Sequence, residues 1–426
     1  MRANVTTRTA GEPGRAVLPR AVPGPGGPIP LGPLLCVQAA GGLVAAGWVA
    51  ESWALGALAV VPSALLVLVV VAWRRGETLP GWLGAALVDR RARRAAAEAL
   101  PRGADPLFAL AAECRPGLRS YAVAARGGRD GRERREVGMA GDGGTLTAVL
   151  RVEASMAPLQ PGRAVRPLPL SLLYGALETD GIRLESVQSV QYTQPAPAPV
   201  LPDRSVAGTS YALLQREGDA PALRLTWVAL RLDPELCPEA VAERGGGLEG
   251  AQRCLTRAAD QLASRLTGAG FTATVLSEAE LLSAVAACTS SNPAATALIG
   301  RSEGQRPRRT AEGLRAWRCD DRWHTTFRVA RWPELGPGAT PLPGLVALLT
   351  SLPAFATTFA LTLRGQGRGD AVLSGHVRVT GRGEGELREA SRQLARAARA
   401  ARVGLTRMDR RQLSGLRATL PLGGGR

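Results

Sequence analysis

Lysine is absent from this chain of 426 residues, so all 53 of its basic side chains are arginine. This absence excludes every mechanism that needs a P-loop lysine, a Schiff-base lysine or a kinase-type lysine. Ala, Gly, Arg and Pro are abundant, which indicates a GC-rich genome as the source of the bias. The excess of basic residues still matters chemically, because the formal net charge of +17 draws the chain to anionic surfaces.

Aromatic residues are also scarce, at 4% of the chain. Proteins that bind nucleic acid combine positive charge with aromatic rings that stack on bases. Membrane topology and anionic lipid headgroups explain the charge better, since each arginine near a membrane surface contributes about 1 kcal/mol of attraction. A membrane-tethered nucleic-acid binder is therefore the less favoured alternative, and we expect no nucleic acid among the partners.

The cysteine spacing of a metal site is missing as well. The chain has no CxxC pair, and neither glycine-rich piece, 365–369 or 381–385, completes GxGxxG. Of its six cysteines and two histidines, only Cys319 and His324 could form half a zinc site, and no second half lies at ligand spacing. Buried, reduced cysteines and strand histidines (His324 and His376) are the simpler interpretation. We expect no catalytic residue, no metal and no cofactor.

What the chain does contain is a long apolar run between Leu31 and Trp73, interrupted by Gln38 and by the short break Glu51-Ser52. A bilayer core takes about 20 apolar residues per helix, and only helices satisfy their own backbone groups in such a hairpin. The run predicts a two-helix transmembrane hairpin with spans of about residues 31–50 and 53–73. Its anchor residues, including tryptophans at the headgroup level, are Leu34, Leu43, Trp48, Trp53, Leu58, Leu66 and Trp73.

Basic residues flank both ends of this hairpin, whereas the turn between the spans carries only Glu51. Arginines near span ends are retained in the cytoplasm, so we expect a multi-pass protein of the cell (inner) membrane with both termini cytoplasmic. A cleaved signal peptide followed by a buried helix is the alternative, but it explains only the first apolar run. The juxtamembrane basic residues are Arg74, Arg75, Arg90, Arg91, Arg93 and Arg94.

The predicted fold class is membrane-anchored α/β: the hairpin followed by a cytosolic mixed α/β region, with two tandem split βαβ units. The order strand, helix, strand, strand, helix, strand, helix occurs twice in the pattern. Ser277 with Glu280, and Asp409 with Gln412, predict the caps of the last helix of each unit. The predicted segments are a disordered tail (1–30), the hairpin (31–73), a basic juxtamembrane helix (74–100), a connecting region (101–143), a first α/β unit (144–289), a linker or loop (290–310) and a second α/β unit (311–426).

Within these units, the strands of the first are expected at 145–152, 182–194, 223–232 and 271–276, with helices opening at 167, 248 and 277. The strands of the second are expected at 324–329, 359–363, 372–379 and 405–408, with helices opening at 341, 386 and 409. In the connecting region, a short helix is expected at 107–112 and a charged, glycine-rich loop at 126–136.

The helix expected at 386–403 carries a ridge of arginines opposite its apolar face. Such a ridge is typical of a solvated face with small pairings to neighbouring carboxylates. Its functional interpretation is a docking surface for an acidic partner. The candidate docking residues are Arg388, Arg392, Arg396 and Arg399.

Two acidic clusters, Asp320-Asp321 and Glu178-Thr179-Asp180, support the enzyme alternative. A DxD-like pair can ligate the divalent metal of a nucleotide-sugar, which would make the chain a membrane-tethered, metal-dependent glycosyltransferase-like enzyme. Asp320-Asp321, however, lies in a predicted hairpin turn, where carboxylates are usually solvated. The segment 381–385 precedes a helix and could hold an anion, although a strand-to-helix turn is the favoured interpretation.

The residues Trp317–Phe327 (WRCDDRWHTTF) run into Arg331-Trp332-Pro333, a tryptophan-containing hairpin strand before a Pro-rich turn. With the two-span hairpin and the basic start of the cytosolic part at 74–94, this resembles the EccE component of actinobacterial type VII (ESX) secretion systems. The resemblance covers nearly the whole chain from about Leu31, and the composition is similar to that of a streptomycete-like source. The Pro-rich segment 195–202 departs from the more compact mycobacterial members.

This resemblance implies a non-enzymatic structural subunit of the type VII protein secretion membrane complex, a peripheral membrane-anchored scaffold with a cytosolic α/β domain. Members of the EccE family assemble with EccB, EccC and EccD, of which EccC is the ATPase motor. The implied partners are EccB-, EccC- and EccD-like subunits in a hetero-oligomeric membrane complex, together with anionic lipid headgroups.

Overall fold

The structure, a computed structural model, describes residues 106–115, 117–127, 133–154, 167–195, 222–300, 308–334, 341–365 and 371–424. The predicted tail, transmembrane hairpin and juxtamembrane helix lie outside these residues, and so do all the anchor residues and the six juxtamembrane arginines named above. Within the described ranges, no helix is both long and apolar enough to span a membrane.

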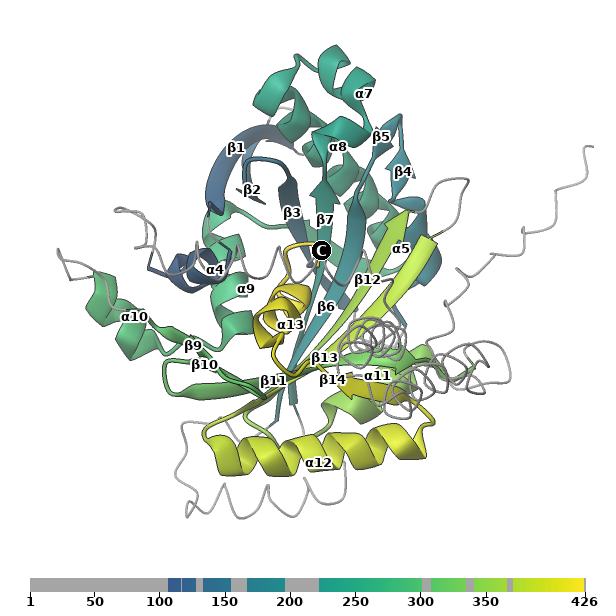
Figure 1. Ribbon diagram of the computed structural model, residues 1–426. Coiled ribbons are helices and arrows are strands. Elements are labelled where there is room, and N and C mark those ends of the chain that lie inside the picture. Colours follow the sequence, from purple (N-terminus) through teal and green to yellow (C-terminus); the bar gives the residue numbers. More distant parts are fainter. Residues whose placement is uncertain are drawn as a thin grey trace, which may run out of the picture.

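Twelve strands form one antiparallel sheet in the order β1-β2-β3-β7-β6-β12-β13-β11-β10-β9, with β8 paired to β3 and β14 paired to β11 (Figure 1). A separate hairpin consists of β4 (Glu178–Thr179) and β5 (Ile182–Arg183). The sheet strands are β1 (Arg119–Gly127), β2 (Glu133–Gly141), β3 (Leu146–Ala154), β6 (Ser186–Pro195), β7 (Ala222–Leu232), β8 (Phe271–Val275), β9 (Thr310–Glu312), β10 (Trp317–Cys319), β11 (Arg322–Arg331), β12 (Ala356–Gly365), β13 (Ala371–Gly381) and β14 (Gly404–Arg407).

Helices cover both faces of this sheet, because side chains alternate between the faces along each strand. Leu146 and Leu150 of β3 join the core beneath one group of helices, whereas Val149 joins the core of the opposite face. The first face carries α5 (Leu170–Gly175), α7 (Pro238–Glu243), α8 (Gly247–Gly268), α11 (Leu342–Thr350) and α12 (Glu384–Ala400). The second face carries α4 (Ala109–Cys114), α9 (Glu278–Thr289) and α13 (Gln412–Thr419). A short 3-10 turn, η1 (Pro234–Leu236), precedes α7, and α10 (Pro293–Gly300) follows α9.

The strand order is the same when it is read outward from the central pair β6–β12 in either direction. In the first half (146–289) the order is β6, β7, β3, and in the second half (322–419) it is β12, β13, β11; β8 and β14 pair on the outer edges. Each half therefore has the element order of a βαββαβ unit. Because β6 and β12 pair in register from Thr193↔Thr357 to Val187↔Leu363, the two halves share a single sheet. The expected mixed α/β architecture is confirmed in this form.

The two long helices repeat the same packing pattern in the two halves. Leu255 and Leu262 of α8 are buried at the spacing of Leu387 and Leu394 of α12, so both helices set one apolar stripe on the sheet. The capping box predicted at Ser277 and Glu280 is present at the start of α9. The cap predicted at Asp409 is wrong: α13 begins after Arg411, and the Asp409 carboxylate instead pairs with the Arg407 guanidinium at 2.6 Å. Arg411 takes the N-cap position, and its side chain makes no cap hydrogen bond.

The end of the described chain crosses from the second half onto the strands of the first (Figure 1). Gln188 of β6 donates to the carbonyl of Ala418 at 2.8 Å and accepts from the amide of Gly423 at 2.9 Å. Gly423 has φ +81°, and a Cβ there would lie 2.6 Å from the Cβ of Arg231, so only glycine fits this crossing. These buried contacts fasten the two halves together on the second face.

Three further predicted assignments differ from the observed elements. The single strand expected at 182–194 is divided into β5 and β6. The charged segment expected to be a loop at 126–136 contains the end of β1 and the start of β2. Within the segment expected to be a linker or loop (290–310), residues 293–300 form α10.

Candidate functional site

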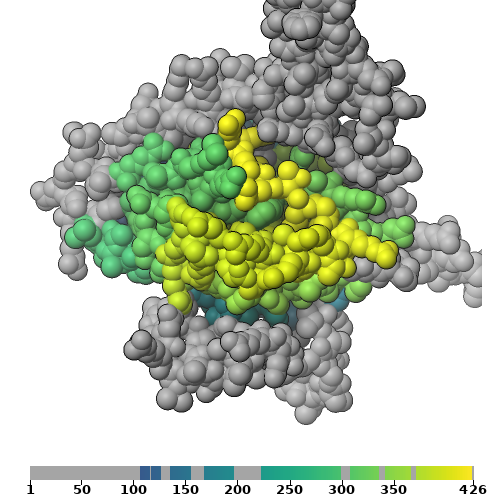
Figure 2. All heavy atoms as spheres, turned by 60° about the horizontal axis from the view of Figure 1, so that its bottom comes forward, coloured from purple at the N-terminus to yellow at the C-terminus, as the bar shows by residue number. Residues whose placement is uncertain are grey.

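The arginine ridge lies on α12, whose opposite face is buried through Leu387, Ala390, Leu394 and Ala398. Figure 2 brings this side of the molecule forward and shows α12 as a yellow-green band across it. Arg388 pairs with Glu384, and Arg392 and Arg396 both reach Glu389 at 3.2 Å. The Nε of Arg399 donates to the carbonyl of Ala395 at 3.1 Å.

These ion pairs are exposed, with the three paired arginine side chains 65–72% accessible to solvent. Hydrogen bonding from Gln393, with Arg392 and Arg396 close by, lowers the pKa of Glu389, so this carboxylate stays ionised. Exposed pairs of this kind contribute little to stability, so the arginines can exchange a local carboxylate for another at little loss of free energy.

A groove of about 670 Å³ lies between the first half of α12 and strand β11. We call it the α12 groove. Its floor contains Phe327 and Leu387, which are buried, and the partly buried Trp323. Four arginines and one carboxylate, Glu384, are among its lining residues. The arginines are Arg315, Arg388, Arg392 and Arg407.

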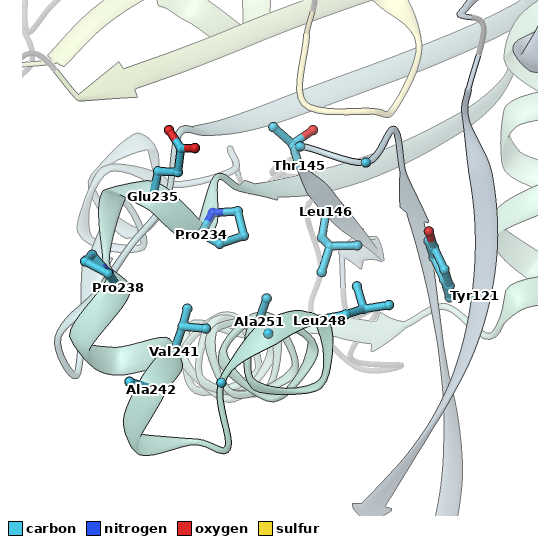
Figure 3. A pocket seen from close by; sticks show the side chains of 14 residues that line it. Tyr121, Thr145, Leu146, Pro234, Glu235, Pro238, Val241, Ala242, Leu248 and Ala251 are labelled. Carbon is cyan, nitrogen blue, oxygen red and sulfur yellow. The ribbon is translucent and has the colours of Figure 1, made fainter.

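A second groove, of about 480 Å³, lies in the first half between the start of α8, the α7 segment and β3 (Figure 3). We call it the α8 groove. Side chains of Leu146, Val241 and Leu248 converge on it, and Tyr121 of β1 closes one side. The single charged side chain in its lining is Glu235. The two grooves therefore differ in charge: one is basic, the other nearly neutral.

The carboxylate pair Asp320-Asp321 does not form a metal site. Asp320 is not solvated as predicted, since its side chain is 7% exposed and pairs with the equally buried Arg309. Arg309 Nε donates to Asp320 Oδ1 at 2.8 Å and Nη2 donates to Oδ2 at 2.6 Å, while the Asn292 amide donates to Oδ2 at 3.0 Å. Both carboxylate oxygens are thus engaged, whereas Asp321 points outward and pairs with Arg322 at 3.0 Å. The hairpin turn itself was predicted correctly, with β10 and β11 on either side.

The other acidic and glycine-rich motifs have structural roles. Asp180, at the β4–β5 turn, pairs with Arg257 of α8 at 3.0 Å, and Glu178 lies 3.6 Å from Arg183. In the segment before α12, the Glu386 carboxylate accepts from the Arg382 amide at 2.7 Å, so the start of that helix already has an anionic partner. The described residues contain no group of three or more His, Cys, Asp or Glu side chains placed to hold a metal.

The five described cysteines are free and buried, and the two histidines lie on strands, as expected. Burial raises the pKa of Cys114 and of Cys288 to about 12, which leaves these thiols unreactive. His324 of β11 contacts Thr380 Oγ1 through its Nδ1 at 3.0 Å, and burial holds its pKa well below the ordinary range. Burial, with Arg328 and Arg364 nearby, lowers the pKa of His376 to about 4.

The burial of Arg378 in β13 was not anticipated from the sequence. Arg378 is fully buried, and its Nη2 donates to the carbonyl of Cys288 and to Thr358 Oγ1. Among the described residues no carboxylate pairs with it, and burial lowers its pKa. Its place between Val377 and Val379 was the available signal. Arg378 links β13 to the end of α9 and thus the second half to the first.

Comparison with protein families gives one match. Residues 220–329 match the model of the family described as "EccE: Putative type VII ESX secretion system translocon, EccE". The matched segment begins at β7, includes the α8 groove from Pro234 to Ala251, and ends within β11 on the sheet side of the α12 groove. It confirms the resemblance to EccE over these residues and carries no information about the source organism. No curated protein matches the chain.

Proposed function

We propose that this chain is an EccE subunit of a type VII (ESX) secretion membrane complex and acts there as a non-enzymatic scaffold. The family match over residues 220–329 carries the proposal. That segment covers α8, α9 and most of β11, so the match involves elements of both halves of the sheet. The engagement of both Asp320 oxygens by Arg309 and Asn292 removes the strongest motif for the enzyme alternative.

We further propose that residues 31–73 anchor the chain as a two-helix hairpin with both termini in the cytoplasm. The apolar run and the flanking arginines of the sequence support this topology. The arginines at 74, 75, 90, 91, 93 and 94 would then lie at the anionic headgroups of the inner leaflet. The α/β units expected at 144–289 and 311–426 would form the cytosolic body.

In this function the cytosolic body contacts EccB-, EccC- and EccD-like subunits, and the arginine ridge of α12 is one of its docking surfaces. The exposure of Arg388, Arg392 and Arg396 supports this role, since the three side chains are accessible and held only by weak local pairs. Energy for transport would come from a partner, in keeping with the lack of a lysine for a P-loop.

Affinity purification from solubilised membranes tests the proposal. The tagged full-length chain is expressed in a host that encodes EccB-, EccC- and EccD-like subunits, and the membranes are extracted with a mild detergent. We expect these three subunits to co-purify with the chain, and a variant that lacks residues 31–73 to lose them. Isolation of the chain alone, from extracts in which the other subunits remain assembled, would contradict the proposal.

A further inference from the structure

The second half of the sheet leaves open a position that the first half fills. Strand β2 pairs with β3 from Met139↔Ala148 to Gly141↔Leu146, and β10 pairs with β11 from Trp317↔His324 to Cys319↔Arg322. Strands β3 and β11 correspond in the two halves, and β2 and β10 pair with the outer edge of each. Beyond Met139, strand β2 leaves β3 and extends as far as Glu133 in its pairing with β1, whereas the chain before β10 turns back at once, with the Gly313 amide donating to the Ala316 carbonyl at 2.8 Å.

The extension of β2 and its partner β1 covers the helix side of the first half. Tyr121, Val123 and Ala125 of β1 pack against the core that α8 forms with the sheet. Arg135 of β2 pairs with Asp260 on α8, so this strand reaches the helix itself. Strands β1 and β2 have 9 residues each, while β9 and β10 have 3 each. Figure 1 shows this difference between the two edges of the sheet.

In the second half the corresponding position is the α12 groove. The turn that replaces the extension of β2 lines it, and Leu314 in this turn is 59% exposed. The floor is apolar, as it is beneath β1, but the helix contributes arginines rather than an aspartate: Arg388 and Arg392 line the groove. Arg315 and Arg407 complete a rim whose lining residues include four arginines and one carboxylate, while Glu389 and Asp409, outside the lining, pair with Arg392 and Arg407.

We propose that the α12 groove binds an acidic, extended segment of a partner protein, in which apolar side chains alternate with carboxylates. Apolar side chains of that segment pack on the floor of the groove at Trp323, Phe327 and Leu387. In the first half, Tyr121 and Val123 of β1 pack on the core beneath α8 in the same way. The carboxylates of the partner segment pair with the arginines of the rim. In the Arg135–Asp260 pair the strand carries the positive charge and the helix the negative one, whereas here the helix would carry the positive charge. A lipid surface fits less well, because the apolar floor is recessed between helix and strand.

The proposal rests on the groove itself and goes beyond the proposed function by giving the chemistry of one partner. It is first tested on the purified full-length chain with a synthetic peptide in which Glu alternates with Val, followed by fluorescence anisotropy. We expect saturable binding that weakens with salt, about tenfold weaker binding to the double variant Arg388→Glu/Arg392→Glu, and no binding of a Lys-for-Glu peptide. The matched control is Arg253→Glu/Arg257→Glu on α8, which makes the same charge change away from the groove and should bind as the wild type.

Photocrosslinking in the membrane complex then identifies the natural segment. A benzoylphenylalanine at position 314 or 391 should crosslink to an acidic segment of a partner subunit, and one at position 264, on the exposed side of α8, should not. Equal peptide binding by the Arg388→Glu/Arg392→Glu variant would overturn the proposal. So would adducts of position 314 with lipid, with a second copy of the chain or with a basic segment.

Circular dichroism of both double variants checks that neither change unfolds the protein. Loss of the whole complex with intact peptide binding would contradict the proposed function and leave this inference standing.

Discussion

The two halves of the sheet share a topology but differ in the strands that cover their edges and in the polar side chains that they bury. The first half covers its edge and the side of α8 with the long strands β1 and β2, and its groove is nearly neutral. The second half ends in two short strands, exposes the arginines of α12 and encloses Arg378, His324 and the Arg309–Asp320 pair. The same βαββαβ topology is therefore covered by additional strands in the first half and leaves a charged helix surface exposed in the second.

Ion pairs in this protein are desolvated to different degrees. Arg231 and Glu185 of the first half pair with side chains 3% and 9% exposed, and Arg309 and Asp320 at the other end of the sheet pair with side chains 4% and 7% exposed. The Arg135–Asp260 pair, which joins a strand to α8, has side chains 35% and 38% exposed. An isolated charge is far less stable in a buried site than near the surface, so breaking a buried pair should cost more than breaking a half-exposed one.

The largest expected effect follows from this contrast. Asp320→Ala leaves the Arg309 guanidinium buried without its carboxylate and should lower the free energy of unfolding by about 3–5 kcal/mol. Asp260→Ala breaks a half-exposed pair and should lower it by less than about 1 kcal/mol. Urea denaturation followed by tryptophan fluorescence measures both. Equal losses for the two variants would contradict the dependence of these pairs on burial.

The next effect tests whether the halves unfold together. Leu394→Ala on α12 and Leu262→Ala on α8 each empty a fully buried site and should destabilise the protein by about 2–5 kcal/mol. Because β6 and β12 join the halves in one sheet, both variants should shift the same single transition. The exposed Leu248 serves as the control, since Leu248→Ala should change stability by less than about 0.5 kcal/mol. Two transitions, each shifted by one variant only, would show that the halves are independent.

Acid sensitivity should reside in the second half, which holds both histidines of the chain. The pKa of His324 is held well below its usual value, and that of His376 is lowered to about 4. Between pH 6.5 and 4 the unfolded chain therefore binds more protons than the folded one, so stability is complete above pH 6.5 and falls as the pH decreases. His376 alone accounts for on the order of 3 kcal/mol over this range.

Hydrogen exchange at pH 7 and pH 5 measures this sensitivity region by region. Strands β11 and β13 should lose protection first, and the variant His324→Gln/His376→Gln should flatten the dependence of stability on pH. Loss of protection that begins in β3 or β7 would contradict the assignment to the second half.

The smallest effect concerns the crossing of the chain end onto the first half. Gln188→Ala removes one hydrogen bond to Ala418 and one from Gly423, and should destabilise the protein by about 1–3 kcal/mol. Exchange should quicken in α13 and β6 together. Unchanged exchange in α13 would show that the crossing does not couple the halves.

Much of this architecture follows from periodicity. The stripes of leucine and alanine on α8 and α12 predict both helices within two residues of their observed starts, and Ser277 with Glu280 predicts the start of α9. The repeated order of elements was visible because each strand and helix buries one regular face. Local signals of this kind depend only on neighbours in the chain.

The elements and contacts that were missed depend on distant partners. The charged part of strands β1 and β2 predicts a loop from the sequence alone, whereas an edge of the sheet tolerates arginine and glutamate. The burial of Asp320 depends on Arg309, which lay in the predicted linker, so the turn sequence alone indicated a solvated carboxylate. The α12 groove exists because the β9–β10 hairpin is short, and no sequence motif marks the position of the groove.

The central claim is that the second half carries the docking surface of a secretion subunit. Hydrogen exchange by mass spectrometry, on the free chain and on the chain within the purified membrane complex, tests it most directly. We predict added protection in the complex at residues 313–316 and at the start of α12, with the exposed face of α8 unchanged. An intact complex in which α12 exchanges as it does in the free chain would contradict the claim.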